Sequence, residues 1–473
     1  MNSYIRDKFK NCLINKCNVD FCTNNKIILA VSGGADSVCM LLLFSEFFDH
    51  NRLICAHFNH KIRQNDAQSD ADFTKSIACN LGIKFVYDEA NVPDFAKENG
   101  YGLEEAARIC RYKFLKNLAN TYGENTLISV AHNKGDRVET ILHNISRGSS
   151  IDGLKGIEYK KENIIRPLLD LSRKEIDEVC NEFQINPVYD KTNSDNYYKR
   201  NKLRNVIIPF LKSSFGDDFE DHIIKLSDSA FIDSKYLNKI TFESYQKCCN
   251  QEFYPFDKIL LNKEAFLELD ESIRNRLIRL ILSKIHDINN KIIFPEYTGI
   301  YSDMILRVKN FLNNSDVGKY TEIGSGVICV TSYGYYYFTH KSLLNPDFYP
   351  AGRVVVEEKS MGSFIKDKNQ LTEFFDYDKL KNLYGEDCVN NFIVSRYDKG
   401  DSIFYPFGMN GHKSLRKFLV DIKIGAFERH FIEYISIKND VLWIPKIRRS
   451  NIAPIDKNTS RVIIMKYISG QEI

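Results

Sequence analysis

The stretch that decides the fold is Ile-Ile-Leu-Ala-Val-Ser-Gly-Gly-Ala-Asp-Ser, residues 27–37. Its first five residues are apolar and read as a buried strand, and a second apolar run after the glycines is long enough for a buried helix. Gly33 and Gly34 open backbone conformations that other residues avoid. Because the first turn of a helix offers unpaired N–H groups and a favourable dipole, the order strand, glycine turn, helix favours an anion such as phosphate.

Polar residues complete this loop. Ser37 is expected to cap the helix, and Asp36 is suited to hold a metal ion that bridges phosphates. An ordinary strand-to-helix turn is the alternative, since the same residues are common in turns. No Gly-Lys-Ser/Thr closes the loop, which excludes a Walker A motif. The string resembles the PP-loop, the pyrophosphate-binding loop of enzymes that split ATP into AMP and pyrophosphate. The resemblance implies that ATP contacts Ser32, Gly33, Gly34, Ala35, Asp36 and Ser37.

Length and composition are those of a globular protein with several domains. At 473 residues, two or three domains are expected. The net charge of only +3 means that a nucleic-acid partner would meet local basic patches. The 12 cysteines include no Cys-x-x-Cys pair, which argues against a zinc ribbon or iron–sulfur site and favours a reducing compartment. No signal peptide or membrane-spanning run is recognised, so we expect a cytoplasmic protein without a membrane partner.

An alternation of strands and helices predicts the fold class. Apolar runs indicate strands at 27–31, 53–58, 83–87 and 126–131, and helical patterns lie at 37–48, 66–81, 103–121 and 134–147. This alternation is typical of right-handed βαβ units and a parallel sheet covered on both faces. We therefore expect an α/β, Rossmann-like ATP-binding domain at 1–216, a mostly helical middle domain at 217–350 and a small α+β domain at 353–473.

Polar and basic residues follow the predicted strands, at the edge where parallel sheets bind ligands. They are Ser32 after the first strand, His57, Asn59 and His60 with Arg63 after the second, and His132 after the fourth. For a single histidine, a hydrogen-bonded structural role is an equal alternative. Three such clusters at one edge nevertheless predict a binding site.

Two of the predicted helices carry charged residues in a regular pattern. Arg108 and Arg111 share one stripe of the helix at 103–121, for which a solvated salt-bridge face is the alternative, and spacing alone favours that alternative. Asp136 and Glu139 fall in the first turns after the fourth strand. Since this position lies at the ligand edge, these carboxylates are suited to hold a metal ion or an ammonium group.

Two segments combine aromatic and basic residues, a composition that suits stacked bases and phosphates. Residues 190–204 interleave tyrosines with lysines and arginines, although a polar loop leading into a helix explains the same pattern. Residues 396–449 contain 11 Lys and Arg against 6 Asp and Glu, a local excess of +5. A normally charged small domain is the alternative to an RNA-binding surface there.

Taken together, these stretches resemble the tRNA(Ile)-lysidine synthetase family. Beyond the PP-loop, the matching motifs are His57-x-Asn59-His60-x-x-Arg63, Glu104-x-x-Ala107-Arg108-x-x-Arg111-Tyr112, Arg147-Gly148, Arg166-Pro167-Leu168, Asp190-x-x-Asn193, Arg200-Asn201 with Arg204, and the C-terminal Gly400-Asp401, Gly408-Met409, Gly411 and Lys413-x-Leu415-x-Lys417. The resemblance spans nearly the whole chain and is weakest over 217–350.

The resemblance implies an activity and a set of roles. The enzyme would adenylate the wobble cytidine of a minor isoleucine tRNA with a CAU anticodon, and free L-lysine would displace AMP to form lysidine. Asp36 would hold Mg²⁺, Arg108 and Arg111 would brace phosphate or the adenylated base, and Asp136 and Glu139 would bind the lysine ammonium and take up its proton. The implied nucleotide contacts include His57, Asn59, His60, Arg63 and His132. The implied substrate contacts include Arg147, Asn193, Arg200, Asn201, Arg204, Lys413, Arg416 and Lys417.

One stretch departs from the family pattern Ala-His-His-x-Asp-Asp-Gln-x-Glu-Thr. Asn133, Gly135 and Arg137 replace its second His, its first Asp and its Gln. The change removes an outer carboxylate, yet Asp136 and Glu139 survive, so we expect the activity to be kept.

Two other functions stay open at this point. Another PP-loop tRNA-modifying enzyme is one, although sulfur insertion usually needs paired cysteines and an amidotransferase needs a glutaminase segment. An RNA-binding protein with a decayed site is the other, and it would bind tRNA without ATP. A homodimer is also compatible with the sequence.

Overall fold

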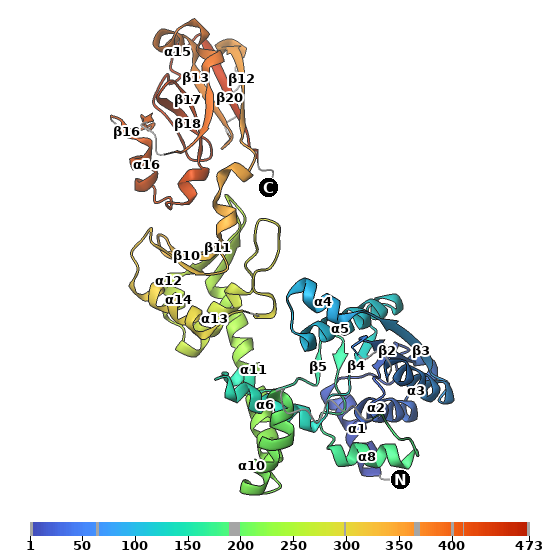
Figure 1. Cartoon of the computed structure of the whole chain (residues 1–473). Helices are drawn as coiled ribbons and strands as arrows, with labels where there is room; N and C mark the ends of the chain where they lie inside the picture. The colour runs from blue at the N-terminus through green and yellow to red at the C-terminus, as the bar shows by residue number, and fades with distance from the viewer. Residues whose placement is uncertain are drawn as a thin grey trace. The chain divides into compact units, whose positions relative to one another are not determined.

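The computed structural model describes residues 3–62, 66–188, 199–297, 299–363, 369–398, 402–409 and 411–470. The chain forms two compact units, Met1–Tyr236 and Leu237–Ile473. The boundary between them falls inside the long helix α11, Phe219–Cys248 (Figure 1). The finer division into three domains at 216 and 350 stays a prediction.

A six-stranded sheet forms the centre of the first unit, with strand order β3-β2-β1-β4-β6-β5. Its strands are β1 (Ile27–Ala30), β2 (Leu53–Asn59), β3 (Lys84–Glu89), β4 (Leu127–Ser129), β5 (Lys160–Lys161) and β6 (Ile164–Ile165). Neighbouring strands pair in parallel, except for the antiparallel edge pair β5 and β6. The predicted parallel α/β fold is therefore confirmed. The β5–β6 hairpin was not predicted, because strands of two residues leave no periodic signal.

Helices cover both faces of this sheet, and β1 illustrates the reason. Ile27 and Leu29 point into one core with residues of α1, α2, α3 and α8, whereas Ile28 points into the other with α5. Successive side chains of a strand point to opposite faces, so a strand buried on both sides is continuously apolar. The helices of this unit are α1 (Ser3–Asn11), α2 (Ala35–Phe47), α3 (Asp66–Asn80), α4 (Val92–Asn99), α5 (Leu103–Tyr122), α6 (Lys134–Ser146), α7 (Ile151–Leu154), α8 (Arg173–Glu182), α9 (Lys199–Lys202) and α10 (Ile208–Phe215).

The second unit begins with helices packed on an antiparallel sheet. The helices after α11 are α12 (Lys263–Leu267), α13 (Glu271–Leu282) and α14 (Ser302–Asn314), and the sheet has the order β7-β8-β11-β10-β9. The strands are β7 (Cys249–Glu252), β8 (Lys258–Asn262), β9 (Tyr320–Gly324), β10 (Val327–Thr331) and β11 (Tyr335–His340). Leu277, Val308 and Phe338 are buried in the core that these helices share with the sheet. The sequence indicated the helices more clearly than this sheet.

The last part of the chain is the expected α+β arrangement. A three-stranded sheet has the order β12-β20-β13, and a second sheet has the order β14-β17-β18-β15-β16 with β19 paired to β18. The elements are β12 (Arg353–Ser360), β13 (Thr372–Asp376), α15 (Tyr377–Tyr384), β14 (Ile393–Arg396), β15 (Ile403–Phe404), β16 (Lys413–Ser414), α16 (Leu415–Asp421), β17 (Glu433–Ile437), β18 (Asp440–Ile444), β19 (Arg448–Arg449) and β20 (Arg461–Ile468). Across the described parts of the chain, none of the helices is long and apolar enough to span a bilayer.

Candidate active site

The loop between β1 and α2 has the geometry of an anion-binding turn. Gly33 has a φ of +96°, a conformation that strains any residue with a side chain, so glycine is required here. Gly34 is the N-cap of α2 in an extended conformation. The expectation that Ser37 caps the helix is wrong, because Ser37 lies inside its first turn. The Ser37 hydroxyl donates to the Gly34 carbonyl at 2.9 Å and accepts from the Ser32 amide at 3.1 Å, which holds the loop closed.

Asp36 lies in the first turn of α2 in a partly buried position, with 33% of its side chain exposed. Nδ2 of Asn133 donates to its Oδ1 at 3.0 Å, and a guanidinium nitrogen of Arg173 lies 3.6 Å from the same oxygen. Burial raises the pKa of Asp36, and the Asn133 hydrogen bond and the Arg173 charge oppose that rise. Burial therefore outweighs these two partners, and an added cation would stabilise the ionised form.

Asn133 also begins α6, the helix that carries the second group of carboxylates. Its side-chain oxygen accepts from the Asp136 amide at 3.1 Å, and the Asp136 carboxylate accepts from the Asn133 amide at 3.0 Å. This reciprocal capping box satisfies amides that a helix start leaves unpaired. Asn133 therefore contacts both Asp36 and Asp136, and it brings the PP-loop and α6 together.

The carboxylates of Asp136 and Glu139 are nearly buried and share a cation. One guanidinium nitrogen of Arg204 lies 2.9 Å from Asp136 Oδ1, and its Nε forms an ion pair with Glu139. Glu139 retains only 3% of its side-chain exposure, whereas Arg204 retains 41%. Arg204 was predicted to contact the substrate, and the structure places its guanidinium on these two carboxylates. A cation-binding group therefore lies next to the PP-loop.

Polar side chains at the carboxyl end of β2 form hydrogen bonds with the backbone and with a neighbouring tyrosine. A ring nitrogen of the buried His57 lies 2.9 Å from the Val31 carbonyl, directly before the PP-loop. Asn59 donates to the Tyr87 hydroxyl at 3.1 Å and accepts from the Lys61 amide at 2.9 Å. These hydrogen bonds give His57 and Asn59 a structural role. Their predicted contact with the nucleotide stays a prediction.

His60 and Arg111 lie close enough to influence each other electrically. Burial and the positive charge of Arg111 lower the pKa of His60 to about 4, so the ring is neutral at pH 7. Among the described residues, its buried Nδ1 has no hydrogen-bond partner. Arg108 and Arg111 both lie over the Tyr112 ring, with the guanidinium carbons 4.7 and 5.9 Å from the ring centroid. This helix face thus carries two cations beside an aromatic ring. The predicted contact of Arg108 and Arg111 with phosphate or the adenylated base stays a prediction.

The remaining predicted residues lie elsewhere or beyond what the structure describes. His132 is partly buried before α6, Arg147 is exposed at its C-terminal end, and Asn201 is partly buried in α9. In the second unit, Lys413 forms an ion pair with Asp421 at 2.6 Å, and Arg416 and Lys417 are exposed on α16. Arg63, Asn193 and the side chain of Arg200 lie outside the described residues.

Three residues at or beside the site were not predicted to act there. Asn133 had a readable signal, because Asn three residues before Asp at a helix start indicates a capping box. Arg173 and Arg137 had none, since their partners lie far away in the chain. Only the tertiary structure identifies them.

Known proteins match this chain over nearly its whole length. Residues 1–211 match the model of the PP-loop domain. The tRNA(Ile)-lysidine synthase of Caldanaerobacter subterraneus subsp. tengcongensis is 31% identical over 471 residues, with 94% of both chains covered. That of Clostridium tetani is 30% identical over 461 residues, with 95% of both chains covered.

Among solved structures, a U34-tRNA thiolase from Methanococcus maripaludis has a TM-score of 0.40 and 17% identity, covering 48% of this chain and 78% of that one. A likeness this low carries no argument about function. The sequence relatives cover nearly the whole chain, and the PP-loop domain lies within the matched region. This chain belongs to the tRNA(Ile)-lysidine synthase family.

Proposed function

We propose that this chain is an ATP-dependent ligase that joins free lysine to the wobble cytidine of a minor isoleucine tRNA with a CAU anticodon, releasing AMP and pyrophosphate. The observation that carries the proposal is the Asn133 bridge, which joins a PP-loop aspartate and an acidic helix start in one site. One half of this site suits a nucleotide, and the other suits an ammonium group. Family membership over the whole chain supplies the reaction class.

The first step would be transfer of AMP to the cytidine. The carbonyl oxygen of the base attacks the α-phosphorus of ATP, and pyrophosphate leaves. The closed Ser32–Ser37 loop and the start of α2 suit the departing pyrophosphate, because amides of a helix N-terminus stabilise negative charge. After adenylation this oxygen leaves readily as part of AMP, whereas the unmodified carbonyl oxygen is a poor leaving group.

In the second step, the ε-amine of lysine would attack the carbon of the base that bears the adenylated oxygen, and AMP would leave with that oxygen. Asp136 and Glu139 would hold the ammonium beside the guanidinium of Arg204 and accept the proton that the amine must lose before it attacks. Their low exposure limits competition from water. Arg108 and Arg111 would face the phosphate of the adenylated base.

A magnesium ion would be held by Asp36. Mg²⁺ in such sites usually takes one or two protein carboxylates and completes its shell with water and phosphate oxygens. Among the described residues no group of three or more His, Cys, Asp or Glu could hold a metal, so the ion would depend on ATP for its remaining ligands. Asp36 fits this role because burial already disfavours its negative charge. When bound, the ion neutralises charge on the phosphates.

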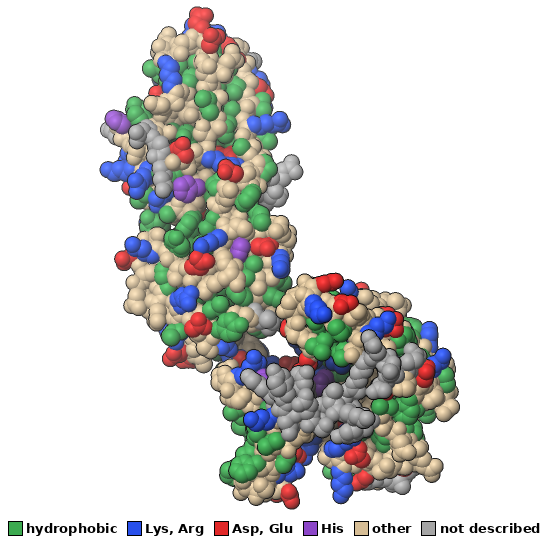
Figure 2. Space-filling model, viewed as in Figure 1, with side chains coloured by type: hydrophobic (Ala, Val, Ile, Leu, Met, Phe, Trp, Pro, Cys, Tyr) green, Lys and Arg blue, Asp and Glu red, His purple; other side chains and the backbone are tan. Residues whose placement is uncertain are grey.

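The C-terminal part would contribute binding of the tRNA. Arg416 and Lys417 are exposed on α16, and Figure 2 shows Lys and Arg side chains on the face of the second unit over this helix. Exposed cations on one helix suit phosphate contacts, which supply affinity without reading bases. Lys413 is the exception, since its ammonium is paired with Asp421.

The decisive experiment uses the full chain with ATP, Mg²⁺, labelled lysine and bulk bacterial tRNA, followed by mild alkali. Label that survives alkali is attached to a base and not to a 3′ ester, and with AMP release it would establish the ligase. AMP formed only with another amine or a sulfur donor would indicate a different PP-loop modification. Binding of tRNA without any ATP cleavage would support a decayed site and contradict the proposal.

A further inference from the structure

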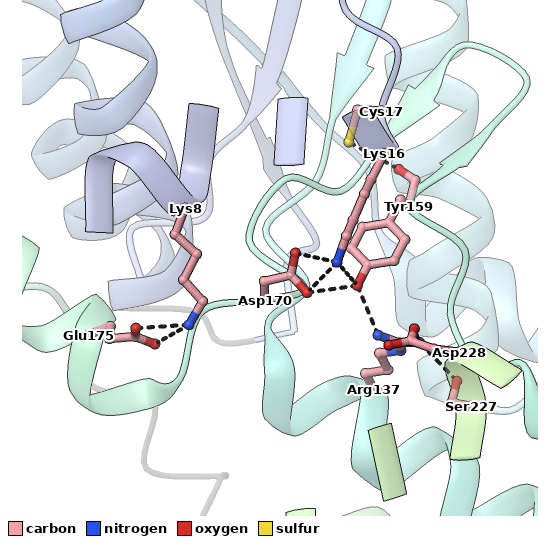
Figure 3. A network of polar contacts seen from close by, with 9 residues as sticks. All are labelled: Lys8, Lys16, Cys17, Arg137, Tyr159, Asp170, Glu175, Ser227 and Asp228. Atoms are coloured by element: carbon pink, nitrogen blue, oxygen red, sulfur yellow. Dashed lines mark hydrogen bonds and ion pairs between the residues drawn. The ribbon is translucent and has the colours of Figure 1, made fainter. Parts of the chain in front are cut away.

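Arg137 is the least exposed charged side chain of α6 and takes no part in the chemistry above. It lies between Asp136 and Val138 and is 1% exposed. Its guanidinium donates to the Tyr159 hydroxyl at 2.8 Å and to the Ser227 hydroxyl at 3.0 Å, and it forms an ion pair with Asp228 (Figure 3). Ser227 and Asp228 belong to α11. Arg137 therefore links α6 to α11 through these contacts.

A second layer of polar contacts supports this guanidinium. The Tyr159 hydroxyl, which accepts from Arg137, donates to Asp170 at 2.7 Å. Lys16 donates to both, at 3.0 Å to the hydroxyl and 2.8 Å to the carboxylate (Figure 3). The Ser227 hydroxyl in turn donates to the Lys155 carbonyl at 2.9 Å. Such a network favours one arrangement of its members, because loss of the Tyr159 or the Ser227 bond leaves part of the buried Arg137 guanidinium unpaired.

The position of Arg137 in the chain gives this network a functional consequence. Its neighbours on α6, Asp136 and Glu139, are the carboxylates assigned to lysine, and a shift of the helix moves all three together. α11 continues from the first compact unit into the second, because the boundary between Tyr236 and Leu237 lies within it. The Asp136 and Glu139 carboxylates are thus tied to α11, which continues into the second unit.

We propose that Arg137 is a positioning residue that sets the Asp136 and Glu139 carboxylates through its bond to α11, so that lysine transfer depends on this contact more strongly than adenylation does. The inference rests on the proposed function and deepens it. A glutamine, which the family pattern has at this position, offers one amide where arginine offers five N–H groups. It cannot replace the ion pair with Asp228.

The test separates the two steps of the reaction. Pyrophosphate release with ATP and tRNA but without lysine reports adenylation, and AMP release on adding lysine reports transfer. For Arg137→Gln we expect a rise in the KM for lysine on the order of tenfold, a size common for residues in one hydrogen-bond network. We expect a much smaller change in the rate of adenylation, because the link from α6 to Asp36 runs through Asn133. A loss shared equally by both steps would indicate a merely structural role and overturn the inference.

Because Arg137 is buried, a variant that leaves the core intact is needed as well. Asp228 keeps 51% of its side-chain exposure, so Asp228→Asn removes the ion pair from the accessible side. We expect the same rise in the KM for lysine, and little further rise in the double variant, because both substitutions remove one interaction. Asp233→Asn, on an exposed aspartate of the same helix, is the matched control and should change nothing.

The failures of the two proposals are distinguishable. If the unaltered protein releases no AMP on addition of lysine, the proposed function fails. If it does so, and Asp228→Asn behaves like Asp233→Asn, the inference about Arg137 fails and the function stands. Additive effects of Arg137→Gln and Asp228→Asn would also contradict it.

Discussion

Nδ2 of Asn133 lies 3.0 Å from Oδ1 of Asp36, although the two residues are 97 positions apart in the chain. The same asparagine caps α6 through its other side-chain atom. One side chain thus fixes the distance between the nucleotide loop and the acidic helix.

Replacing Asn133 should shift the acidic side of the pH–activity profile to higher pH. Its hydrogen bond lowers the pKa of Asp36, so its loss raises that pKa further, and a higher pH is needed to ionise the carboxylate. Asn133→Ser keeps a good N-cap but shortens the side chain away from Asp36, whereas Asn133→Ala also loses the cap, at about 1 kcal/mol of stability. Activity against pH should shift upward in both variants. An unmoved limb in Asn133→Ser would contradict the role of the bridge.

Asp36→Asn should abolish turnover without weakening the fold at neutral pH. Its folded pKa is raised, so the stability linked to its protonation is present at low pH and is lost as the pH rises through that pKa. At pH 7 the charge of this partly buried carboxylate is therefore unfavourable, and the neutral amide should leave the free energy of unfolding unchanged or higher. Denaturant titrations at pH 4 and pH 7 measure this, and the advantage of the variant should grow with pH. A fall of tRNA affinity in step with activity would count against the role of Asp36.

His60 should make the protein less stable in mild acid. Its pKa is lowered from 6.5 to about 4, so its contribution to stability is complete above 6.5 and is lost as the pH falls toward 4. His60→Gln should remove that part of the pH dependence. The measurement is the free energy of unfolding of both proteins at intervals across this window. Parallel curves would show that the histidine is not held neutral by burial and Arg111.

The double variant Arg416→Ala, Lys417→Ala should weaken tRNA binding and reduce its salt dependence. Each lost phosphate contact reduces, by roughly 0.7 to 0.9, the steepness with which the logarithm of the tRNA association constant falls against the logarithm of the salt concentration. Lys457→Ala removes one exposed lysine from another part of the same unit and serves as the control for charge alone. ATP binding should not change in any of these variants. A loss of binding free energy in the double variant no more than twice that in the control would mean that the effect is one of net charge, because the double variant removes two charges and the control one.

Much of the first unit was predictable from residue order. The strands and helices around the PP-loop fall within a few residues of their predicted ends, because strand and helix periods are local properties of the chain. His57, His60 and Asp136 were placed at the ligand edge for the same reason, since in a parallel sheet every strand ends at that edge. Their partners were not predictable, because residue order does not specify which distant side chains meet.

The sequence by itself thus determined the fold class, the nucleotide loop and the acidic helix start, all of which depend on residues close together in the chain. Only the tertiary structure decided that Arg204 pairs with Asp136 and Glu139, and that Arg137 joins α6 to α11. A guanidinium has no periodic pattern that reveals its partner. Its place follows from which carboxylate lies within reach once the apolar cores have packed, and this geometry exists only in the folded chain.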